Sequence, residues 1–215
     1  MRITVLLVWL IGCIMGPALA NANGSGTLLV VGDSLSAAYN LEIGEGWVNL
    51  LGDRLAENGY DFTVVNASIS GDTTSGGRAR LPAALARHKP TVVVLELGGN
   101  DGLRGIPIKT MRANLTAMIE ASREAGAAVV LLGIRIPENY GRRYADEFFA
   151  TYGELARDFS LAHVEFFMDG VALDDSLMQS DGIHPNVDAQ PILLENAWPA
   201  IKSVLSETTA AVAAK

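Results

Sequence analysis

The fold of this chain is decided by the stretch Thr27–Ser36, TLLVVGDSLS, in which an apolar run stops abruptly at a glycine. Leu28–Val31 is apolar at every position, which is typical of a strand buried on both faces of a parallel sheet. Asp33 and Ser34 follow Gly32 directly, so the strand ends by presenting a serine on a loop. Loops at strand ends are where a rigid scaffold displays reactive groups, and Ser34 is therefore a candidate nucleophile.

Apolar, strand-like runs alternate with longer segments of helical periodicity along the rest of the chain. The expected strands are Leu28–Val31, Phe62–Val65, Thr91–Leu97, Ala128–Ile134 and Val164–Phe167. The expected helices are Gly46–Asn58, Arg78–His88, Lys109–Ala125, Tyr144–Phe159 and Pro191–Val204, and Ser206–Lys215 is expected to be a flexible tail of small residues. This alternation predicts the α/β class, with a parallel sheet of about five strands covered by helices on both faces.

The segment Met1–Ala20 has the layout of a secretory signal peptide. A cationic residue precedes an apolar run, and Ala18-Leu19-Ala20 matches an A-x-A cleavage site. Residues 21–215 are then expected to form a single exported domain, periplasmic or secreted, with no stable membrane insertion after cleavage. A second interpretation is that Leu10-Ile11-Gly12-Cys13 is a lipoprotein box with a lipid on Cys13. The signal peptide is favoured, because the leader before that cysteine would be very short.

The composition excludes several kinds of site. Cys13 is the only cysteine, so cleavage after Ala20 leaves no disulfide, cysteine nucleophile or thiolate metal site. The chain carries 24 acidic and 16 basic residues, a net charge of −8. An acidic chain without a basic run is a poor candidate for binding nucleic acid or an anionic membrane. A small molecule is the expected partner, and a monomer is expected because no assembly motif is visible.

Polar turns follow two more of the expected strands. Gly71-Asp72 comes after the second strand and Gly98–Asp101 after the third. In a parallel sheet, ligands bind outside the carboxyl ends of the strands, so Ser34, Gly71 and Asn100 are expected to meet at one rim.

The candidate base is found by elimination among three histidines. His88 lies at a helix C-terminus, where a cation is favourable, and is expected to be structural. His163 opens the last strand at the opposite edge and is also expected to be structural. His184 remains, and Asp181 lies three residues before it, which lets a carboxylate reach the imidazole and fix its tautomer.

Four blocks, taken together, resemble those of a known enzyme family. They are GDSL at Gly32–Leu35, SGD at Ser70–Asp72, GGND at Gly98–Asp101 and DGIHP at Asp181–Pro185. In order and spacing they resemble the signature blocks of the SGNH (GDSL) hydrolases, and within these the bacterial arylesterase, lysophospholipase L1 and thioesterase I subfamily. The resemblance implies a three-layer α/β/α sandwich with a flavodoxin-like sheet, and a serine hydrolase that uses no metal and no cofactor.

The resemblance also assigns roles to individual residues. Ser34 resembles the nucleophile of the family, His184 its general base, and Asp181 the residue that orients this base. The backbone amides of Ser34 and Gly71 and the side-chain amide of Asn100 resemble its oxyanion hole. Residues that bind substrate are expected in the loops after the third and fourth strands, and the candidates are Leu103, Arg104, Pro107, Pro137, Tyr140 and Tyr144.

Two acidic residues close to these blocks are expected to be structural. Asp33 is expected to hold the turn at the nucleophile through an Asx-type hydrogen bond. Glu96 lies in an apolar strand and is expected to be a buried carboxylate whose hydrogen bonds are satisfied.

The sequence therefore predicts an exported esterase of broad acyl range, which hydrolyses carboxylic esters and thioesters through an acyl-serine intermediate. Two alternatives stay open. The same fold carries carbohydrate O-acetyl esterases, which would favour acetylated glycans over long acyl chains. The chain could also be a catalytically idle module that binds an acyl or sugar ligand, although an idle module has no reason to keep the full set of Ser34, Gly71, Asn100, Asp181 and His184.

Overall fold

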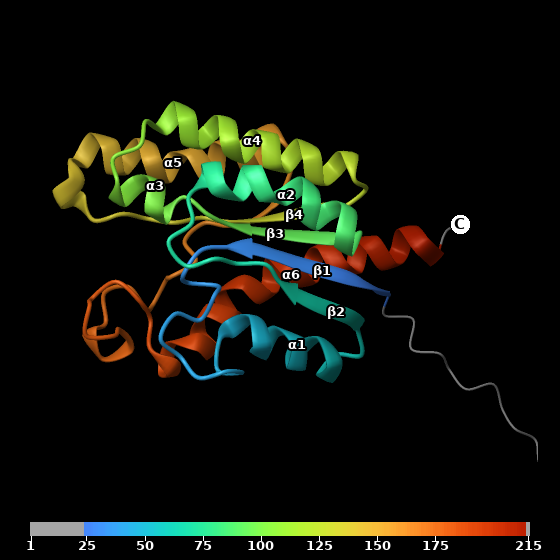
Figure 1. Cartoon of the computed structure of the whole chain (residues 1–215). Coiled ribbons are helices and arrows are strands. Elements are labelled where there is room, and N and C mark those ends of the chain that lie inside the picture. The colour runs from blue at the N-terminus through green and yellow to red at the C-terminus, as the bar shows by residue number, and fades with distance from the viewer. Residues whose placement is uncertain (1–23, 214–215) are drawn as a thin grey trace, which may run out of the picture.

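Five parallel strands form one sheet at the centre of the molecule (Figure 1). The structure, a computed structural model, describes residues 24–213, so the leader and Cys13 lie outside the described residues. The strands are β1 (Ser25–Gly32), β2 (Asp61–Asn66), β3 (Val92–Glu96), β4 (Ala128–Leu132) and β5 (Ala162–Val164), in the order β2-β1-β3-β4-β5. The predicted α/β class and the predicted parallel sheet of about five strands are confirmed.

Helices cover both faces of this sheet. Figure 1 shows α1 (Trp47–Glu57) and α6 (Gln190–Ala213) below it. The helices α2 (Thr74–His88), α4 (Ile108–Glu124) and α5 (Arg142–Asp158) lie above it. The described part of the chain also contains four shorter helices: α3 (Gly99–Leu103), η1 (Glu138–Tyr140), η2 (Asp175–Leu177) and η3 (Val187–Ala189). Among the described residues, none of the helices is both long and apolar enough to cross a membrane.

The two apolar cores explain why the strands are apolar throughout. In β1, Leu28 and Val30 face the core shared with α1 and α6, whereas Leu29 and Val31 face the core shared with α2, α4 and α5. All four side chains are completely buried. A strand that is covered on both sides has no polar face, so its residues are apolar at successive positions.

The strand order places the candidate site. After β1 the chain moves outward to β2, and it then crosses back to add β3 on the other side of β1. The loops that leave β1 and β3 therefore diverge, and a ligand crevice opens between them at the carboxyl ends of the strands. Gly32, the last residue of β1, pairs with Glu96, the last residue of β3. The segments that carry Ser34 and Asn100 thus start side by side.

The second helix begins earlier than its sequence predicted. We expected Arg78–His88, because glycines such as those at 76 and 77 disfavour a helix, but α2 starts at Thr74. The Thr73 side chain caps it by accepting a hydrogen bond from the backbone N–H of Gly76. Asp101 binds the first residue, with its carboxylate 2.8 Å from the backbone nitrogen of Thr74 and 2.5 Å from its hydroxyl. This long-range contact stabilises the first turn and cannot be inferred from local propensity.

The end of the chain also differs from the prediction. Helix α6 continues past Val204 to Ala213, so residues 206–213 are helical where we expected a flexible tail. Its alanines are strong helix formers, and no glycine or proline interrupts them. The last strand is displaced as well, because β5 is Ala162–Val164 and not Val164–Phe167. His163 consequently lies within this edge strand, not at its start.

Candidate active site

Ser34 lies in the tight turn that follows β1. The turn is closed by a hydrogen bond of 2.9 Å from the backbone N–H of Ala37 to the carbonyl of Asp33. The Asp33 carboxylate accepts a further hydrogen bond, 3.1 Å long, from the backbone N–H of Leu35. This is the Asx-type bond expected from the sequence. It holds the two residues that flank Ser34 and so fixes the direction of the serine side chain.

Three side chains far apart in the sequence form a hydrogen-bonded relay. His184 Nε2 lies 2.8 Å from Ser34 Oγ, and His184 Nδ1 lies 2.7 Å from Asp181 Oδ2. The ring of Tyr39 packs against the imidazole, with 4.5 Å between the ring centroids. A serine, an imidazole and a carboxylate in this order can activate the hydroxyl as a nucleophile, because the imidazole can take its proton and the carboxylate can stabilise the resulting cation.

Asp181 is held as a carboxylate by the loop around it. Its Oδ1 accepts hydrogen bonds from the backbone N–H groups of Ile183, at 2.9 Å, and His184, at 3.0 Å. The hydrogen bond to the His184 ring, followed by these backbone bonds, lowers the pKa of Asp181 to about 2. The carboxyl group therefore stays ionised at the pH values at which a histidine can act as a base.

Asn100 is tied to the turn at the nucleophile. Its side-chain Nδ2 donates a hydrogen bond of 3.1 Å to Asp33 Oδ2. An amide nitrogen carries two hydrogens, so this bond leaves one for another acceptor. Because Asp33 precedes Ser34 directly, the amide of Asn100 is held next to the serine, and both residues line the same cavity.

Gly71 lies on the loop that continues β2 along the end of β1. The backbone N–H of Ile69 donates to the carbonyl of Gly32 at 3.1 Å, and Arg104 Nη2 donates to the carbonyl of Gly71 at 3.0 Å. Gly71 has φ +79°, a conformation that favours glycine. An added Cβ would meet only Arg104 Nη2, at 3.9 Å, so the backbone conformation explains this glycine better than crowding does.

A cavity of about 300 Å³ opens at Ser34 and His184. Apolar side chains make up most of its wall. They come from the turn at the nucleophile, α3, the end of β4 and the long loop before α6, and they are Leu35, Leu103, Ile134, Ile136, Pro137, Met168, Ala172, Met178 and Ile183. Such a wall suits an apolar group attached to the atom that the serine attacks.

Only two of the six residues expected to bind substrate line this cavity, namely Leu103 and Pro137. Arg104 instead binds the carbonyl of Gly71. The hydroxyl of Tyr144 donates to the carbonyl of Ile106, at 2.7 Å. Tyr144 packs against the core that the sheet shares with α2, α4 and α5. Pro107 caps α4 and Tyr140 lies exposed in η1. Tyr144 lies in the first turn of α5, whereas Arg104, Pro107 and Tyr140 lie on the expected loops or in the short helix η1. None of the four lines the cavity.

Sequence reasoning missed most of the cavity wall. Ile134 and Ile136 could have been found, because they continue the apolar pattern past the end of β4 with the spacing of two that lets residues share a side. Met168 and Met178 lie in an irregular segment between β5 and α6. An irregular segment has no periodicity, so nothing in the sequence indicates which way these side chains point.

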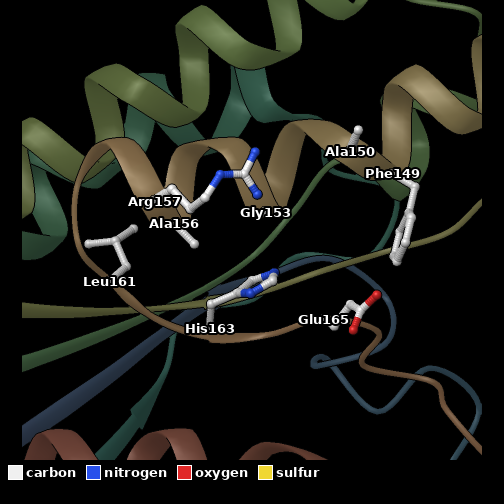
Figure 2. Close-up of a pocket in the computed structure, with 8 residues that line it drawn as sticks. All are labelled: Phe149, Ala150, Gly153, Ala156, Arg157, Leu161, His163 and Glu165. Carbon is white, nitrogen blue, oxygen red and sulfur yellow. The ribbon is translucent and has the colours of Figure 1, made fainter.

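Figure 2 shows a second pocket, of about 750 Å³, between α5 and the edge strand β5. It is lined by Phe149, Ala150, Gly153, Ala156, Arg157, Leu161, His163 and Glu165. His163 Nε2 is buried and has no hydrogen-bond partner in the described part of the chain. Burial lowers the pKa of this imidazole, so it is held in its neutral form. The pocket shares no residue with the cavity at Ser34.

Two acidic groups are buried beneath the turn at the nucleophile. Asp33 and Glu96 are 2% and 0% exposed. Burial raises the pKa of Asp33 to about 6. Burial, and next the negative charge of Asp33, raises the pKa of Glu96 well above its usual value. Within residues 24–213, no three His, Cys, Asp or Glu side chains lie close enough together to hold a metal ion.

The packing of Glu96 also explains the glycine of the GDSL block. A Cβ on Gly32 would lie 2.6 Å from Glu96 Oε2 and 2.7 Å from Ser36 Oγ. We expect Gly32→Ala to lower the free energy of unfolding by about 1–3 kcal/mol, because neither group can move without breaking its hydrogen bonds. The matched control is Gly52→Ala in α1, where nothing lies within 4 Å of the new Cβ. Urea denaturation should show this control to be more stable than the wild type, by about 0.5–1 kcal/mol. Equal stability of Gly32→Ala and the wild type would contradict the packing argument.

The chain is similar to known proteins over most of its length. The profile of the GDSL-like Lipase/Acylhydrolase family matches residues 30–190. Esterase TesA of Pseudomonas aeruginosa is 54% identical over 194 residues, which cover 90% of this chain and 96% of that protein. Thioesterase 1/protease 1/lysophospholipase L1 of Escherichia coli is 47% identical over 174 residues, which cover 81% of this chain and 82% of that protein.

A solved structure gives the same result for the fold. The psychrotrophic esterase EstA from Pseudoalteromonas sp., crystallised with the inhibitor monoethylphosphonate, superposes with a TM-score of 0.80. It is 44% identical in sequence, and the match covers 84% of this chain and 98% of that one. The family profile spans the segment from β1 to the start of α6, with the serine turn at one end and the histidine loop at the other. From the family profile and these identities, the chain belongs to the GDSL-like lipase/acylhydrolase family.

Proposed function

We propose that this protein is a serine esterase in which Ser34 is the nucleophile, His184 the general base and Asp181 the residue that orients the base. The observation that carries the proposal is the relay itself, with 2.8 Å between Ser34 Oγ and His184 Nε2 and 2.7 Å between His184 Nδ1 and Asp181 Oδ2. Both distances lie in the range required for proton transfer and for orientation of the ring.

The first half of the proposed reaction forms an acyl enzyme. Ser34 Oγ attacks the carbonyl carbon of the ester or thioester while His184 Nε2 takes its proton. The negative charge that develops on the carbonyl oxygen is stabilised by the backbone N–H groups of Ser34 and Gly71 and by the second amide hydrogen of Asn100. The tetrahedral intermediate collapses, the bond to the leaving group breaks, and His184 gives the proton to the departing oxygen or sulfur.

The second half releases the acid. Water enters on the side vacated by the leaving group, and His184 takes one of its protons as the oxygen attacks the acyl-serine. The same three donors stabilise the second oxyanion. When the C–O bond to Ser34 breaks, His184 returns its proton to Ser34 Oγ and the free enzyme is restored. Every proton in this cycle passes through Nε2, while Nδ1 stays bonded to Asp181.

The apolar cavity wall supports the proposed substrate class. Carboxylic esters and thioesters with a medium or long acyl chain, such as aryl esters, acyl-CoA-like thioesters and lysophospholipids, can place that chain against the apolar side chains around Ser34. The volume of about 300 Å³ exceeds what an acetyl group needs. The carbohydrate O-acetyl esterase is therefore the less favoured alternative.

A series of p-nitrophenyl esters from acetyl to long chain tests the acyl range. We expect kcat/KM to rise from acetyl to medium chains, because each buried methylene contributes about 0.8 kcal/mol at most. The measurement is initial rates on the protein that begins at Asn21. Activity confined to the acetyl ester would contradict this proposal and favour the carbohydrate esterase. A folded protein without activity on any ester would favour the idle binding module.

Export and a monomeric state complete the proposal. The leader-like segment 1–20 supports export to the periplasm or the exterior, and it lies outside the described residues. Sequencing the N-terminus of the mature protein tests this point directly. An N-terminus at Asn21 supports cleavage by signal peptidase, whereas a lipid-bearing N-terminus at Cys13 would contradict it. Light scattering of the same preparation tests the monomer.

A further inference from the structure

Glu96 is a buried acid that the proposed reaction does not use. It ends β3, directly opposite Gly32 at the end of β1, and its side chain is 0% exposed. Its Oε2 accepts hydrogen bonds from the hydroxyl of Ser36, at 2.7 Å, and from the backbone N–H of Asp33, at 3.3 Å. Glu96 therefore binds residues on both sides of Ser34.

The two oxygens of this carboxyl group differ in their surroundings. Oε2 accepts from the Ser36 hydroxyl and the Asp33 backbone N–H, and the Ser36 hydroxyl accepts in turn from Trp47 Nε1, at 3.3 Å. Oε1 is buried and has no hydrogen-bond partner within the described part of the chain. An ionised carboxylate would spread its charge over both oxygens and leave one unsolvated, which is costly. A neutral acid fits better, because it leaves an uncharged atom without a partner instead of part of a negative charge.

We propose that Glu96 is a positioning residue of the oxyanion hole, which as a neutral acid clamps the turn 32–36 and thereby keeps the Asp33 carboxylate aligned with the side-chain amide of Asn100. We expected a buried carboxylate whose hydrogen bonds are satisfied, and Oε1, which has no partner among the described residues, corrects that expectation. The inference rests on the proposed role of Asn100, because the clamp acts on catalysis through that amide.

The link to Asn100 passes through Asp33. The backbone N–H of Asp33 is bound by Glu96 and its side-chain Oδ2 is bound by Asn100 Nδ2. As an acceptor, the Asp33 carboxylate selects the amide orientation of Asn100 that places its nitrogen toward the site. If Glu96 releases the turn, this carboxylate shifts and the donor aimed at the oxyanion shifts with it.

The charged and titratable groups around the pair favour one proton on Glu96. Two other carboxyl groups lie nearby, Asp33 in the turn and Asp101 in α3. Tyr152 from α5 is a neutral phenol, because burial, followed by the charges of the neighbouring acids, raises its pKa well above the usual value. His184 favours the ionised form of Asp33, and Asp72 opposes it. Asp33, the less buried acid and the one with an Asn100 donor, ionises first, and its charge then opposes ionisation of Glu96.

The kinetic test compares two substitutions of Glu96, one that removes the hydrogen-bond acceptor and one that keeps it. Glu96→Leu removes the acceptor, so we expect kcat on p-nitrophenyl acetate to fall about 10–100-fold with little change in KM, because the donor and the nucleophile are displaced together. Glu96→Gln keeps an uncharged oxygen acceptor at this position and should restore most of that loss. A Glu96→Leu enzyme with wild-type kcat would overturn the positioning role.

The protonation test does not depend on activity. The infrared spectrum of the wild type at neutral pH should contain the C=O stretching band of a buried, protonated carboxylic acid. Glu96→Gln should remove this band and Asp33→Asn should keep it. A wild-type spectrum with carboxylate bands alone, or a band lost only in Asp33→Asn, would overturn the neutral state of Glu96. Since this readout needs no turnover, it stands even if Ser34 proves not to be the nucleophile.

The pH dependence of stability gives a third readout. The folded protein keeps the Glu96 proton above pH 4.5, the usual pKa of the group, whereas the unfolded chain loses it. The folded state then holds more protons than the unfolded state, so stability contributed by the neutral acid is complete at low pH and decreases as the pH rises. Tm should fall more steeply with increasing pH in the wild type than in Glu96→Gln. Parallel Tm curves would contradict a proton held by Glu96.

Discussion

Ser34→Ala is expected to lower kcat on p-nitrophenyl esters by about 10⁴–10⁶-fold, the largest effect of any single substitution in this protein. The substitution removes the oxygen that attacks the ester, and the backbone N–H of residue 34 remains in place as an oxyanion donor. The residual rate should therefore come from substrate binding and the oxyanion hole alone. The relevant measurement is kcat at saturating substrate, with intact mass after treatment with an alkyl phosphonate as a second readout.

Ser75→Ala is the matched control for this experiment. Ser75 is an exposed serine in the first turn of α2 and makes no contact with the cavity at Ser34. The control should keep wild-type kcat and should gain one phosphonate adduct, whereas Ser34→Ala should gain none. If Ser34→Ala hydrolyses esters at the wild-type rate, the proposed nucleophile is wrong. If it loses activity but still takes the adduct, a second nucleophile is present.

Asn100→Ala is expected to lower kcat by about 10²–10³-fold while KM changes little, because its amide binds the oxyanion in the transition state and not the ester in the ground state. The fold should survive, since Asn100 is a partly exposed residue at the start of the short helix α3. Kinetics on the acetyl ester and a thermal unfolding curve check the two statements separately.

Asn100→Asp sharpens this prediction. Aspartate has nearly the same volume as asparagine, but it offers no amide hydrogen and would place a second negative charge beside Asp33, whose Oδ2 now accepts from Asn100. A loss of kcat at least as large as that of Asn100→Ala is expected. Wild-type kcat in either variant would remove Asn100 from the oxyanion hole, and an equal loss in kcat and in thermal stability would point to a structural role instead.

The fold could be predicted because it depends on local signals. Completely apolar runs such as Leu28–Val31 report a strand covered on both faces, and their alternation with helical periodicity reports a parallel sheet. The predictions that were wrong concern the ends of helices and strands. Helix α2 starts at Thr74, where Asp101, 27 residues further on, binds its first residue and the Thr73 side chain caps it. The Ala-rich end of α6 is helical, as the high helix propensity of alanine favours, although its small side chains predicted a tail.

The candidate site could be predicted in part for the same reason. Ser34, Gly71, Asn100, Asp181 and His184 each belong to a short block of distinctive composition, so their positions stand out without a structure. The residues of the cavity wall cannot be recognised from the sequence in this way. Met168 and Met178 come from an irregular loop, and Arg104 and Tyr144 turn to backbone carbonyls of Gly71 and Ile106 that no sequence pattern connects to them.

By itself, the sequence determined the α/β class, the order of the strands along the chain and the five residues proposed for catalysis, because these follow from periodicity and from short motifs. The tertiary structure decided which side chains surround Ser34, and it alone revealed the contact between Glu96 and the turn at the nucleophile. That contact joins residues 60 or more positions apart through hydrogen bonds of one buried carboxyl group. The protonation state of Glu96 depends on burial and on the nearby charge of Asp33, and both arise only when β1 and β3 lie side by side.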